Sequence, residues 1–592
     1  MSHEIALEEE FARVPLRRAT LRRLGGYLGP HRGAMALGLF IEFTWVWMLV
    51  LDAKLIQLAV DGPLARHDVS GVLGYAAFIA LNAAVRSAIT VFELRLTNRV
   101  GVDVLHAIRK HVFDHIQSLS MRYFDRTKQG RILARADRDV DSLEHLYTWG
   151  PVVFVSLLTS LLGGFVRIGS QYVYLLPYLA VAVPVLWAVT RLFERFGFPA
   201  YRKIRETHSA ISSHVAESIT GVRVIKAFSA EEREGEKLAG LQKDYRSAIV
   251  RGARISNGFI PTLSLAIQAL LVVALLLGAR EALEGRLTLG QLLESVLLLG
   301  MVLGPVEGLG SLYNESLVAG AAAERIFLLI DTQPEVRDAP GAEDAGRLSG
   351  AVEFDRVSFS YDPAGAGGRQ LHEVSFRAVA GERIALVGHT GAGKTSILNL
   401  LARFYEPQEG VIRLDGRDAK TLTGASIHRQ MGIVLQENFL FAGSVLENLR
   451  FVRPGISEAD ARAGFVALGC LDVLDGFSSG LSTDVGERGA NLSEGERQIV
   501  CFARAFLSNP SILILDEATS AVDTRTEALI LKALDALSAR QTTFVIAHRL
   551  STVRHADRIL VLEQGRLVEQ GRHDDLIAAG GAYASLYREY AR

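Results

Sequence analysis

The sequence predicts a two-part protein, in which an all-α transmembrane domain of six helices precedes an α/β domain with a phosphate-binding loop. Three observations support this fold class. Hydrophobic residues make up 49% of the 592 residues, and the mean hydropathy of +0.22 is high for a soluble protein. The long apolar runs end near residue 310. A glycine-rich motif in the remaining part has the spacing of a phosphate-binding loop.

Six apolar segments are candidates for membrane spans, since a helix needs about 20 apolar residues to cross a bilayer. They are 34–60, 72–94, 152–168, 172–193, 255–278 and 289–309. One such segment alone is also typical of a buried helix in a soluble protein, but six in one half favour a membrane domain. The charged regions between spans predict helices that continue into the cytoplasm. Their turns, at 123–132 and 217–228, are either simple helix–helix turns or docking surfaces for the second domain.

The distribution of arginines predicts the orientation in the membrane. Six arginines precede the first span: Arg13, Arg17, Arg18, Arg22, Arg23 and Arg32. Basic residues favour the cytoplasmic side, so we expect a multi-pass protein of the cytoplasmic (inner or cell) membrane. With six spans, both termini are then cytoplasmic.

Composition indicates a reducing compartment and disfavours both a signal peptide and nucleic-acid binding. The two cysteines, Cys470 and Cys501, lie in the second part and fit a reducing compartment without a disulfide framework. The N-terminal stretch lacks the apolar region of a signal peptide. A net charge of −1 gives no basic footprint for nucleic acid.

Acidic residues inside the spans are candidates for a substrate path, because charges within a membrane are costly and are usually functional. They are Glu42, Glu294 and Glu307. One hypothesis is that they favour a cationic or polar-headed substrate. The alternative is that they pair with Arg86 or Arg167, which also lie within apolar sequence.

The domain boundaries follow from composition. Residues 1–330 form the predicted transmembrane domain, and residues 331–350 form a linker rich in Pro, Gly, Ala and Asp. Residues 351–592 form the second domain. Its motif, G-x-x-x-x-G-K-T, lies between a strand-like run and a helix-like run, which predicts a P-loop NTPase fold. The residues expected to bind ATP there are Gly388, His389, Thr390, Gly391, Ala392, Gly393, Lys394, Thr395 and Ser396.

Further residues of the second domain fit nucleotide chemistry. Asp516 ends an apolar strand-like run and can hold Mg²⁺ with Thr395, while the following Glu517 can act as general base on the attacking water. Gln436 can reach both Mg²⁺ and that water. His548 can contact the γ-phosphate. Tyr361 can stack on adenine. Each of these alone is also typical of a purely structural residue, and their order along the chain is what favours catalysis.

A segment before a long helical run resembles the signature of ABC transporters. It consists of Leu492, Ser493, Glu494, Gly495 and Glu496. With the motifs above, the whole chain resembles a half-size ABC exporter of the multidrug and lipid-flippase type. The resemblance implies that two ATPase domains close head to tail on two ATP molecules, with each signature facing the partner's loop. Ser520 and Asp523 resemble the loop that crosses to the partner domain.

Two positions depart from the usual signature, Leu-Ser-Gly-Gly-Gln. Glu494 replaces the first glycine and Glu496 replaces the glutamine. Repulsion between a carboxylate and a phosphate charge about 7 Å away disfavours ATP binding by roughly 2 kcal/mol. This departure favours a heterodimer with a second half-transporter over the rival, a slowly hydrolysing homodimer.

The function expected from the resemblance is ATP-driven export or flipping of a small amphipathic substrate, such as a drug, lipid or peptide-like molecule. The alternative is an ATP-gated channel or membrane regulator on the same scaffold, against which the complete catalytic set argues. Import is disfavoured because the two parts are fused. The sequence does not identify the substrate.

Overall fold

The computed structural model describes residues 18–303, 305–362, 368–516, 524–538, 541–546 and 553–590. These residues fall into two compact units. The first lies within Met1–Gln117 and Gly130–Asp331, and the second within Ser118–Gln129 and Thr332–Arg592. The short segment Ser118–Gln129 therefore packs with the C-terminal unit, although it lies inside the predicted 1–330 domain.

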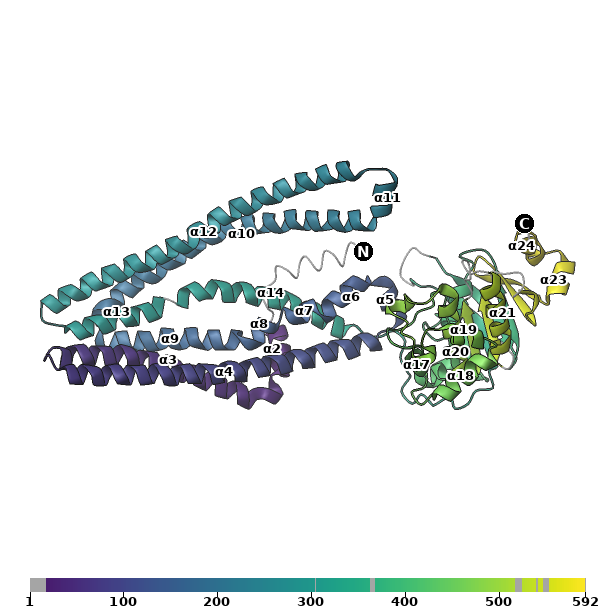
Figure 1. The fold of residues 1–592 in the computed structure, drawn as a ribbon, viewed down its shortest axis with the longest axis horizontal. Coiled ribbons are helices and arrows are strands. Elements are labelled where there is room, and N and C mark those ends of the chain that lie inside the picture. The colour runs from purple at the N-terminus through teal and green to yellow at the C-terminus, as the bar shows by residue number, and fades with distance from the viewer. Residues whose placement is uncertain are drawn as a thin grey trace. The chain divides into compact units, whose positions relative to one another are not determined.

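The regular elements of the first unit are all helices in the part that the structure describes (Figure 1). The long ones alternate with short turns and 3-10 or π segments. In chain order they are α2 (Arg18–Tyr27), η1 (Gly29–His31), α3 (Arg32–Ala59), η2 (Val60–Leu64), α4 (Val69–Ser118), α6 (Gln129–Ala136), α7 (Arg138–Asp141), α8 (Glu144–Thr148), α9 (Gly150–Gln171), η3 (Val173–Leu175), α10 (Leu176–Thr220), α11 (Val222–Ala227), α12 (Glu231–Leu283), α13 (Leu289–Leu303) and α14 (Pro305–Asp331).

The helices agree with the predicted spans. Among the described residues, five helical stretches are long and apolar enough to cross a membrane, and they contain the first five predicted spans except for residue 172, the first residue of the fourth span. The sixth predicted span, 289–309, coincides with the apolar 15-residue helix α13 and the first turns of α14, which begins at Pro305. Helix α4 has 50 residues, or about 75 Å at 1.5 Å per residue. This is more than twice the thickness of a bilayer's hydrocarbon core, about 30 Å.

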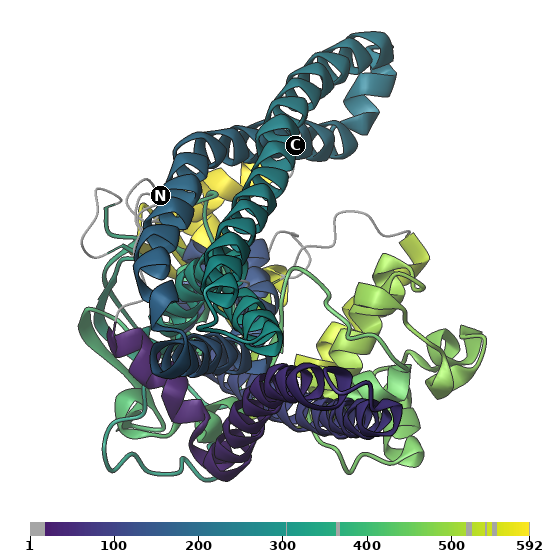
Figure 2. The same cartoon turned by 90° about the vertical axis from the view of Figure 1, so that its left-hand side faces the viewer.

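Helices α10 and α12 lie side by side, and the short helix α11 joins the C-terminal end of α10 to the N-terminal end of α12 (Figure 2). The rings of Phe193 and Phe259 stack between them at 4.0 Å. Near α11 the apolar side chains point outward, with Val224 61% and Phe228 79% exposed. The predicted turn at 217–228 therefore presents apolar side chains.

The core of the first unit lies where α3, α9, α10, α12 and α13 meet. Val50, Ile168, Leu179 and Leu298 are buried there. A glycine allows two of these helices to approach closely, because a Cβ on Gly164 of α9 would lie 2.3 Å from the Val302 side chain of α13. Small residues of this kind drive helix packing in membranes, where apolar side chains gain little by leaving the lipid.

The second unit contains two sheets. The antiparallel sheet has the order β2-β1-β4-β5, and the larger sheet has the order β10-β9-β3-β8-β7-β6. In the larger sheet all neighbouring strands are parallel except β9 and β10. The strands are β1 (Val352–Phe359), β2 (Leu371–Ala378), β3 (Arg383–Val387), β4 (Glu409–Leu414), β5 (Arg417–Asp418), β6 (Met431–Val434), β7 (Ile512–Asp516), β8 (Thr542–Ile546), β9 (Arg558–Glu563) and β10 (Arg566–Gly571).

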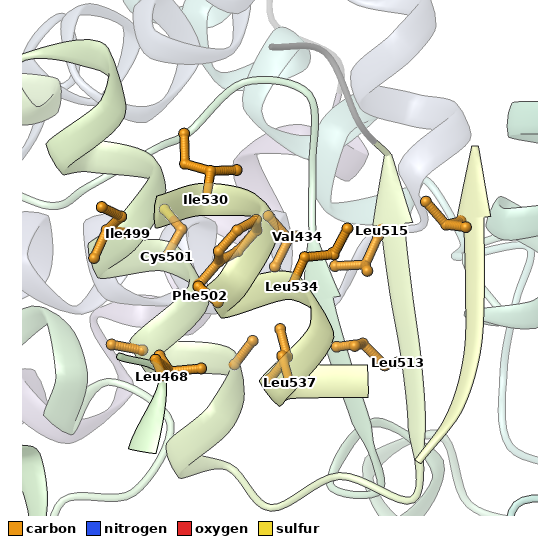
Figure 3. Close-up of a cluster of buried hydrophobic side chains, with 14 of the residues drawn as sticks. Val434, Leu468, Ile499, Cys501, Phe502, Leu513, Leu515, Ile530, Leu534 and Leu537 are labelled. Carbon is orange, nitrogen blue, oxygen red and sulfur yellow. The ribbon is translucent and has the colours of Figure 1, made fainter. Parts of the chain in front are cut away.

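The central strands β3, β7 and β8 are almost entirely buried, because helices or the other sheet cover both faces. On one face, Leu513 and Leu515 of β7 pack against Phe502 of α20 and Leu534 of α21 (Figure 3). The helices of this unit are α5 (Met121–Arg126), α15 (Lys394–Leu401), α16 (Gly424–His428), α17 (Val445–Arg450), α18 (Glu458–Ala467), α19 (Leu471–Gly476), α20 (Glu494–Leu507), α21 (Thr524–Ser538), α23 (His573–Ala579) and α24 (Ala582–Tyr590).

Helix α5, which directly follows the membrane helix α4 in sequence, is held to the C-terminal unit by charged side chains. Arg122 Nε lies 2.9 Å from Glu335 Oε2. Arg126 Nη2 donates a hydrogen bond to Asp362 Oδ1 at 3.0 Å. The predicted turn at 123–132 therefore begins with a helix that packs on the α/β domain.

Candidate functional site

The glycine-rich loop runs from the end of β3 into α15, as predicted. The φ angles of Gly388, Gly391 and Gly393 are 153°, 83° and 102°, which lie in the region that favours glycine. A Cβ on Gly388 would lie 2.2 Å from the carbonyl oxygen of Leu562, and a Cβ on Gly393 would lie 2.7 Å from the Leu371 side chain. Both space and backbone conformation therefore require glycine at these two positions.

Lys394 is the first residue of α15 and is 7% exposed. Its Nζ donates hydrogen bonds to the carbonyl oxygens of Gly388 at 2.7 Å and His389 at 3.0 Å. Burial lowers the pKa of Lys394 from its ordinary value, and the charge of Asp516 opposes this shift. The ammonium group is thus held inside the curve of the loop, where phosphate oxygens bind in loops of this kind.

The other predicted loop residues divide into exposed and buried side chains. His389, Thr390 and Thr395 are exposed, while Ala392 and Ser396 are buried. The exposed Thr395 hydroxyl, at the start of α15, is available to a metal ion or a phosphate.

The carboxyl ends of β3, β8, β7 and β6 lie at one edge of the sheet, since these strands are parallel. Ligands of open α/β sheets bind at this edge. Asp516 is the last residue of β7, and Gln436 follows the end of β6 by two residues. Both line one cavity, together with Asn438 and Gln498. The structure therefore brings together two of the residues predicted to serve Mg²⁺.

Tyr361 lies just after β1 and close to the loop helix. Its phenol oxygen accepts hydrogen bonds from Asn399 Nδ2 at 3.0 Å and Ser396 Oγ at 3.3 Å. Its ring makes edge-to-face contacts with Phe359 at 4.8 Å and Tyr405 at 5.0 Å. Tyr361 is thus fixed beside the first turns of α15.

The signature-like segment forms the start of α20. Ser493 is the N-cap, and its hydroxyl accepts a hydrogen bond from the Glu496 backbone N–H at 3.3 Å. The Glu496 carboxylate accepts a bond from the Ser493 N–H at 2.8 Å, which completes a capping box. Leu492 and Gly495 are buried, whereas Glu494 is exposed. The carboxylate of Glu496 is therefore turned back onto its own helix.

Several predicted residues lie outside the described residues. They are Glu517, Ser520, Asp523 and His548, together with the side chain of Glu307, whose backbone belongs to α14. Their roles stay predictions.

Comparisons with known proteins agree with this arrangement. Residues 34–306 match the family model described as the ABC transporter transmembrane region, and residues 371–520 match the model described as ABC transporter. The chain is 35% identical over 586 residues to the uncharacterised ABC transporter ATP-binding protein YknV of Bacillus subtilis, which covers 98% of this chain and 96% of YknV. The chain belongs to the ABC transporter family.

Two further relatives show how far the similarity extends. The ATP-dependent lipid A-core flippase of Methylobacillus flagellatus is 32% identical over 590 residues, which is 99% of each chain. A solved structure of a bacterial Atm1-family ABC exporter with ATP bound superposes with a TM-score of 0.78 at 31% identity, covering 97% of this chain and 99% of that one.

The chain is therefore a half-size ABC exporter, a multi-pass membrane protein in which one helical transmembrane domain is fused to one ATPase domain. ATP binding and hydrolysis by the ATPase domain drive export. A half-transporter carries only one of the two ATPase domains that a transporter of this family needs, so the exporter dimerises.

Two of the acidic residues predicted to line a substrate path, Glu42 and Glu294, are buried in the transmembrane domain. Glu294 is 0% exposed, and its carboxylate accepts hydrogen bonds from Arg167 Nε at 3.0 Å and the Tyr172 hydroxyl at 2.6 Å. Glu42 is 6% exposed. For Glu294, the structure has the geometry of the alternative expectation, pairing with Arg167.

Sequence reasoning missed some partners. Arg86 pairs with Asp52, with Nη1 and Oδ2 2.5 Å apart. Among the described side chains, it pairs with neither Glu42 nor Glu294. Asp52 lies within a predicted span, so a search for every acidic residue there would have found it. No sequence signal indicated Tyr405, whose contact with Tyr361 depends on packing between separate elements.

Proposed function

We propose that the exporter moves a small amphipathic molecule, such as a drug, lipid or peptide-like compound, across the cytoplasmic membrane by alternating access. The observation that carries this proposal is the presence, on one chain, of membrane-length helices and a preformed phosphate-binding loop. ATP favours the closed state of the paired ATPase domains, and hydrolysis removes that preference. Both termini and the ATPase domain lie on the cytoplasmic side.

In the proposed site, the backbone N–H groups of Gly391 and Gly393 and the Lys394 ammonium bind phosphate oxygens. Tyr361 stacks on the adenine base. Glu517 orients and deprotonates the attacking water, and His548 contacts the γ-phosphate. Ser493 and Gly495 bind the phosphates of the ATP held by the partner chain. Ser520 and Asp523 belong to the loop that crosses to the partner domain.

The donor set fits Mg²⁺, which prefers hard oxygen ligands in an octahedral arrangement completed by water and phosphate. Three side chains would hold it: the Thr395 hydroxyl, the Asp516 carboxylate and the Gln436 amide oxygen. Bound there, the ion would neutralise charge that develops on the β- and γ-phosphates.

The partner in the dimer is a second half-transporter. Glu494 and Glu496 were the two reasons to expect a different chain with a better signature. The capping geometry weakens the argument from Glu496, because a glutamate at N3 of the helix caps the helix in the same way as a glutamine. Glu494 remains an argument for a heterodimer.

The deciding experiment is the ATPase activity of the chain purified alone and reconstituted in lipid, with Glu517→Gln as the matched control. Robust activity that the substitution abolishes would establish a working homodimer. Activity no higher than that of Glu517→Gln would mean that a second chain is missing. Measurable ATP binding without turnover in every lipid and with every candidate partner would instead favour an ATP-gated channel and contradict the proposal.

A further inference from the structure

Helix α5 is in contact with the segment that carries Tyr361. Arg126 Nη2 donates a hydrogen bond to the Tyr361 carbonyl oxygen at 3.3 Å, and the same nitrogen bonds to the neighbouring Asp362 carboxylate at 3.0 Å. Only two residues separate α5 from the membrane helix α4. The helix that contacts the Tyr361 segment is therefore joined to α4 by only a short covalent connection.

Tyr405 makes a second connection between α5 and Tyr361. It is 3% exposed, and its hydroxyl donates a hydrogen bond to the Asp125 carboxylate of α5. Its ring meets Tyr361 at 5.0 Å and Phe359 at 5.5 Å, both in edge-to-face geometry. Burial, with the Asp125 carboxylate, raises the pKa of Tyr405 above its ordinary value, so its hydroxyl stays a donor. The guanidinium of Arg122 also lies 5.7 Å from the Tyr405 ring centre.

The Tyr361 ring is thus restrained at both ends. Asn399 and Ser396, in the helix that follows the phosphate-binding loop, hold its hydroxyl. Tyr405 and Phe359 both make edge-to-face contacts with its ring, and such contacts contribute beyond the area they bury. An aromatic ring restrained in this way loses little conformational freedom when a base stacks on it.

We propose that Tyr405 is a positioning residue that links α5 to the adenine-stacking ring of Tyr361, so that the state of the membrane helices alters the affinity for the adenine base. This inference rests on the proposed role of Tyr361. Coupling between two sites is reciprocal, so adenine binding also acts back on α5. The phosphate-binding loop binds the triphosphate independently of this link.

The first test compares equilibrium binding of ATP and of inorganic tripolyphosphate, which lacks the base. Tyr405→Phe removes only the bond to Asp125, and Asp125→Ala removes it from an exposed position where the fold is not at risk. Each should raise the Kd for ATP about fivefold, the effect of one hydrogen bond worth about 1 kcal/mol. Neither should change the Kd for tripolyphosphate. Tyr583→Phe is the matched control, since this buried tyrosine bonds to His573 elsewhere in the same domain.

The second test uses intrinsic fluorescence. All four tryptophans, Trp45, Trp47, Trp149 and Trp187, lie in the transmembrane domain, so a change in their emission on adding ATP reports the membrane helices alone. At saturating ATP, the change should be smaller in Tyr405→Phe and Asp125→Ala than in the wild type and Tyr583→Phe. A substitution that only weakened ATP binding would leave the saturated change intact.

Tyr361→Ala separates the two levels of the proposal. If it leaves the Kd for ATP unchanged, Tyr361 does not stack on adenine and the proposed role fails. Alternatively, Tyr361→Ala weakens ATP binding, but Tyr405→Phe and Asp125→Ala keep the wild-type Kd and the full fluorescence change. This result would overturn the link through Tyr405 and would leave the proposed role of Tyr361 intact.

Discussion

At the scale of single residues, the signature-like segment shows that the effect of a charged side chain depends on its position in the helix. Glu496 occupies the third position of α20, and its carboxylate accepts hydrogen bonds from the N–H and hydroxyl of Ser493. A negative charge at a helix N-terminus is stabilised by the unpaired N–H groups there. Glu496 is thus a capping residue, and these bonds would weaken the effect on a partner's phosphate that the resemblance implies for this position.

Substitutions at position 496 test this role. Glu496→Gln should keep the stability of the exporter within a few tenths of a kcal/mol, whereas Glu496→Ala should lower it by about 1 kcal/mol, as for loss of a helix cap. Thermal unfolding of the purified protein measures both. No loss for Glu496→Ala would show that the capping box contributes nothing to stability, and an equal loss for Gln and Ala would show that the carboxylate charge matters rather than the capping bond.

At the scale of elements, a buried ion pair joins the membrane helices α9 and α13. Arg167 and Glu294 are hydrogen-bonded within the core, and Lys54 of α3 lies 3.9 Å from the same carboxylate. The side chain of Glu294 is 0% exposed and that of Arg167 is 24% exposed. Removing one partner of a buried pair is far more costly than replacing both by apolar residues.

The substitution Glu294→Ala should therefore destabilise the exporter by about 3 kcal/mol or more, because Arg167 keeps its charge without its main partner. The double variant Glu294→Leu with Arg167→Leu should recover most of this loss. Thermal unfolding in detergent measures both. The substrate-path hypothesis makes the opposite prediction, that Glu294→Gln changes transport selectivity while stability stays that of the wild type.

At the scale of the whole molecule, the chain must cross the membrane in one orientation. The native cysteines, Cys470 and Cys501, are buried, so an introduced cysteine can be labelled against a low background. Arg66 is exposed in the turn between α3 and α4, and Phe228 is exposed just after α11. These positions lie on opposite sides of the membrane if the termini are cytoplasmic.

A membrane-impermeant maleimide should label Arg66→Cys in intact cells and should label Phe228→Cys only after permeabilisation. The wild-type chain is the control for labelling of Cys470 and Cys501. The reverse pattern would place the termini and the ATPase domain outside the cytoplasm and would contradict the proposed orientation.

The sequence alone determined the features that depend on neighbours along the chain. A membrane span is one continuous apolar segment, and the phosphate-binding loop is a strand, a turn and a helix within one short stretch. The sequence of each segment therefore predicts the span or the loop without information about residues far away in the chain. The ABC transporter family and the order of its motifs followed from the same local patterns.

Tertiary structure decided the contacts between distant elements. Tyr405 bonds to Asp125 across 280 residues, and Arg167 bonds to Glu294 across 127 residues. Hydropathy says that a helix is apolar but does not say which of its faces meets which neighbour. That packing decides whether a carboxylate in a span pairs internally or faces a substrate. It also decides whether Glu496 caps its own helix. The physical reason is that charge interactions and hydrogen bonds depend on distances, which only the folded chain fixes.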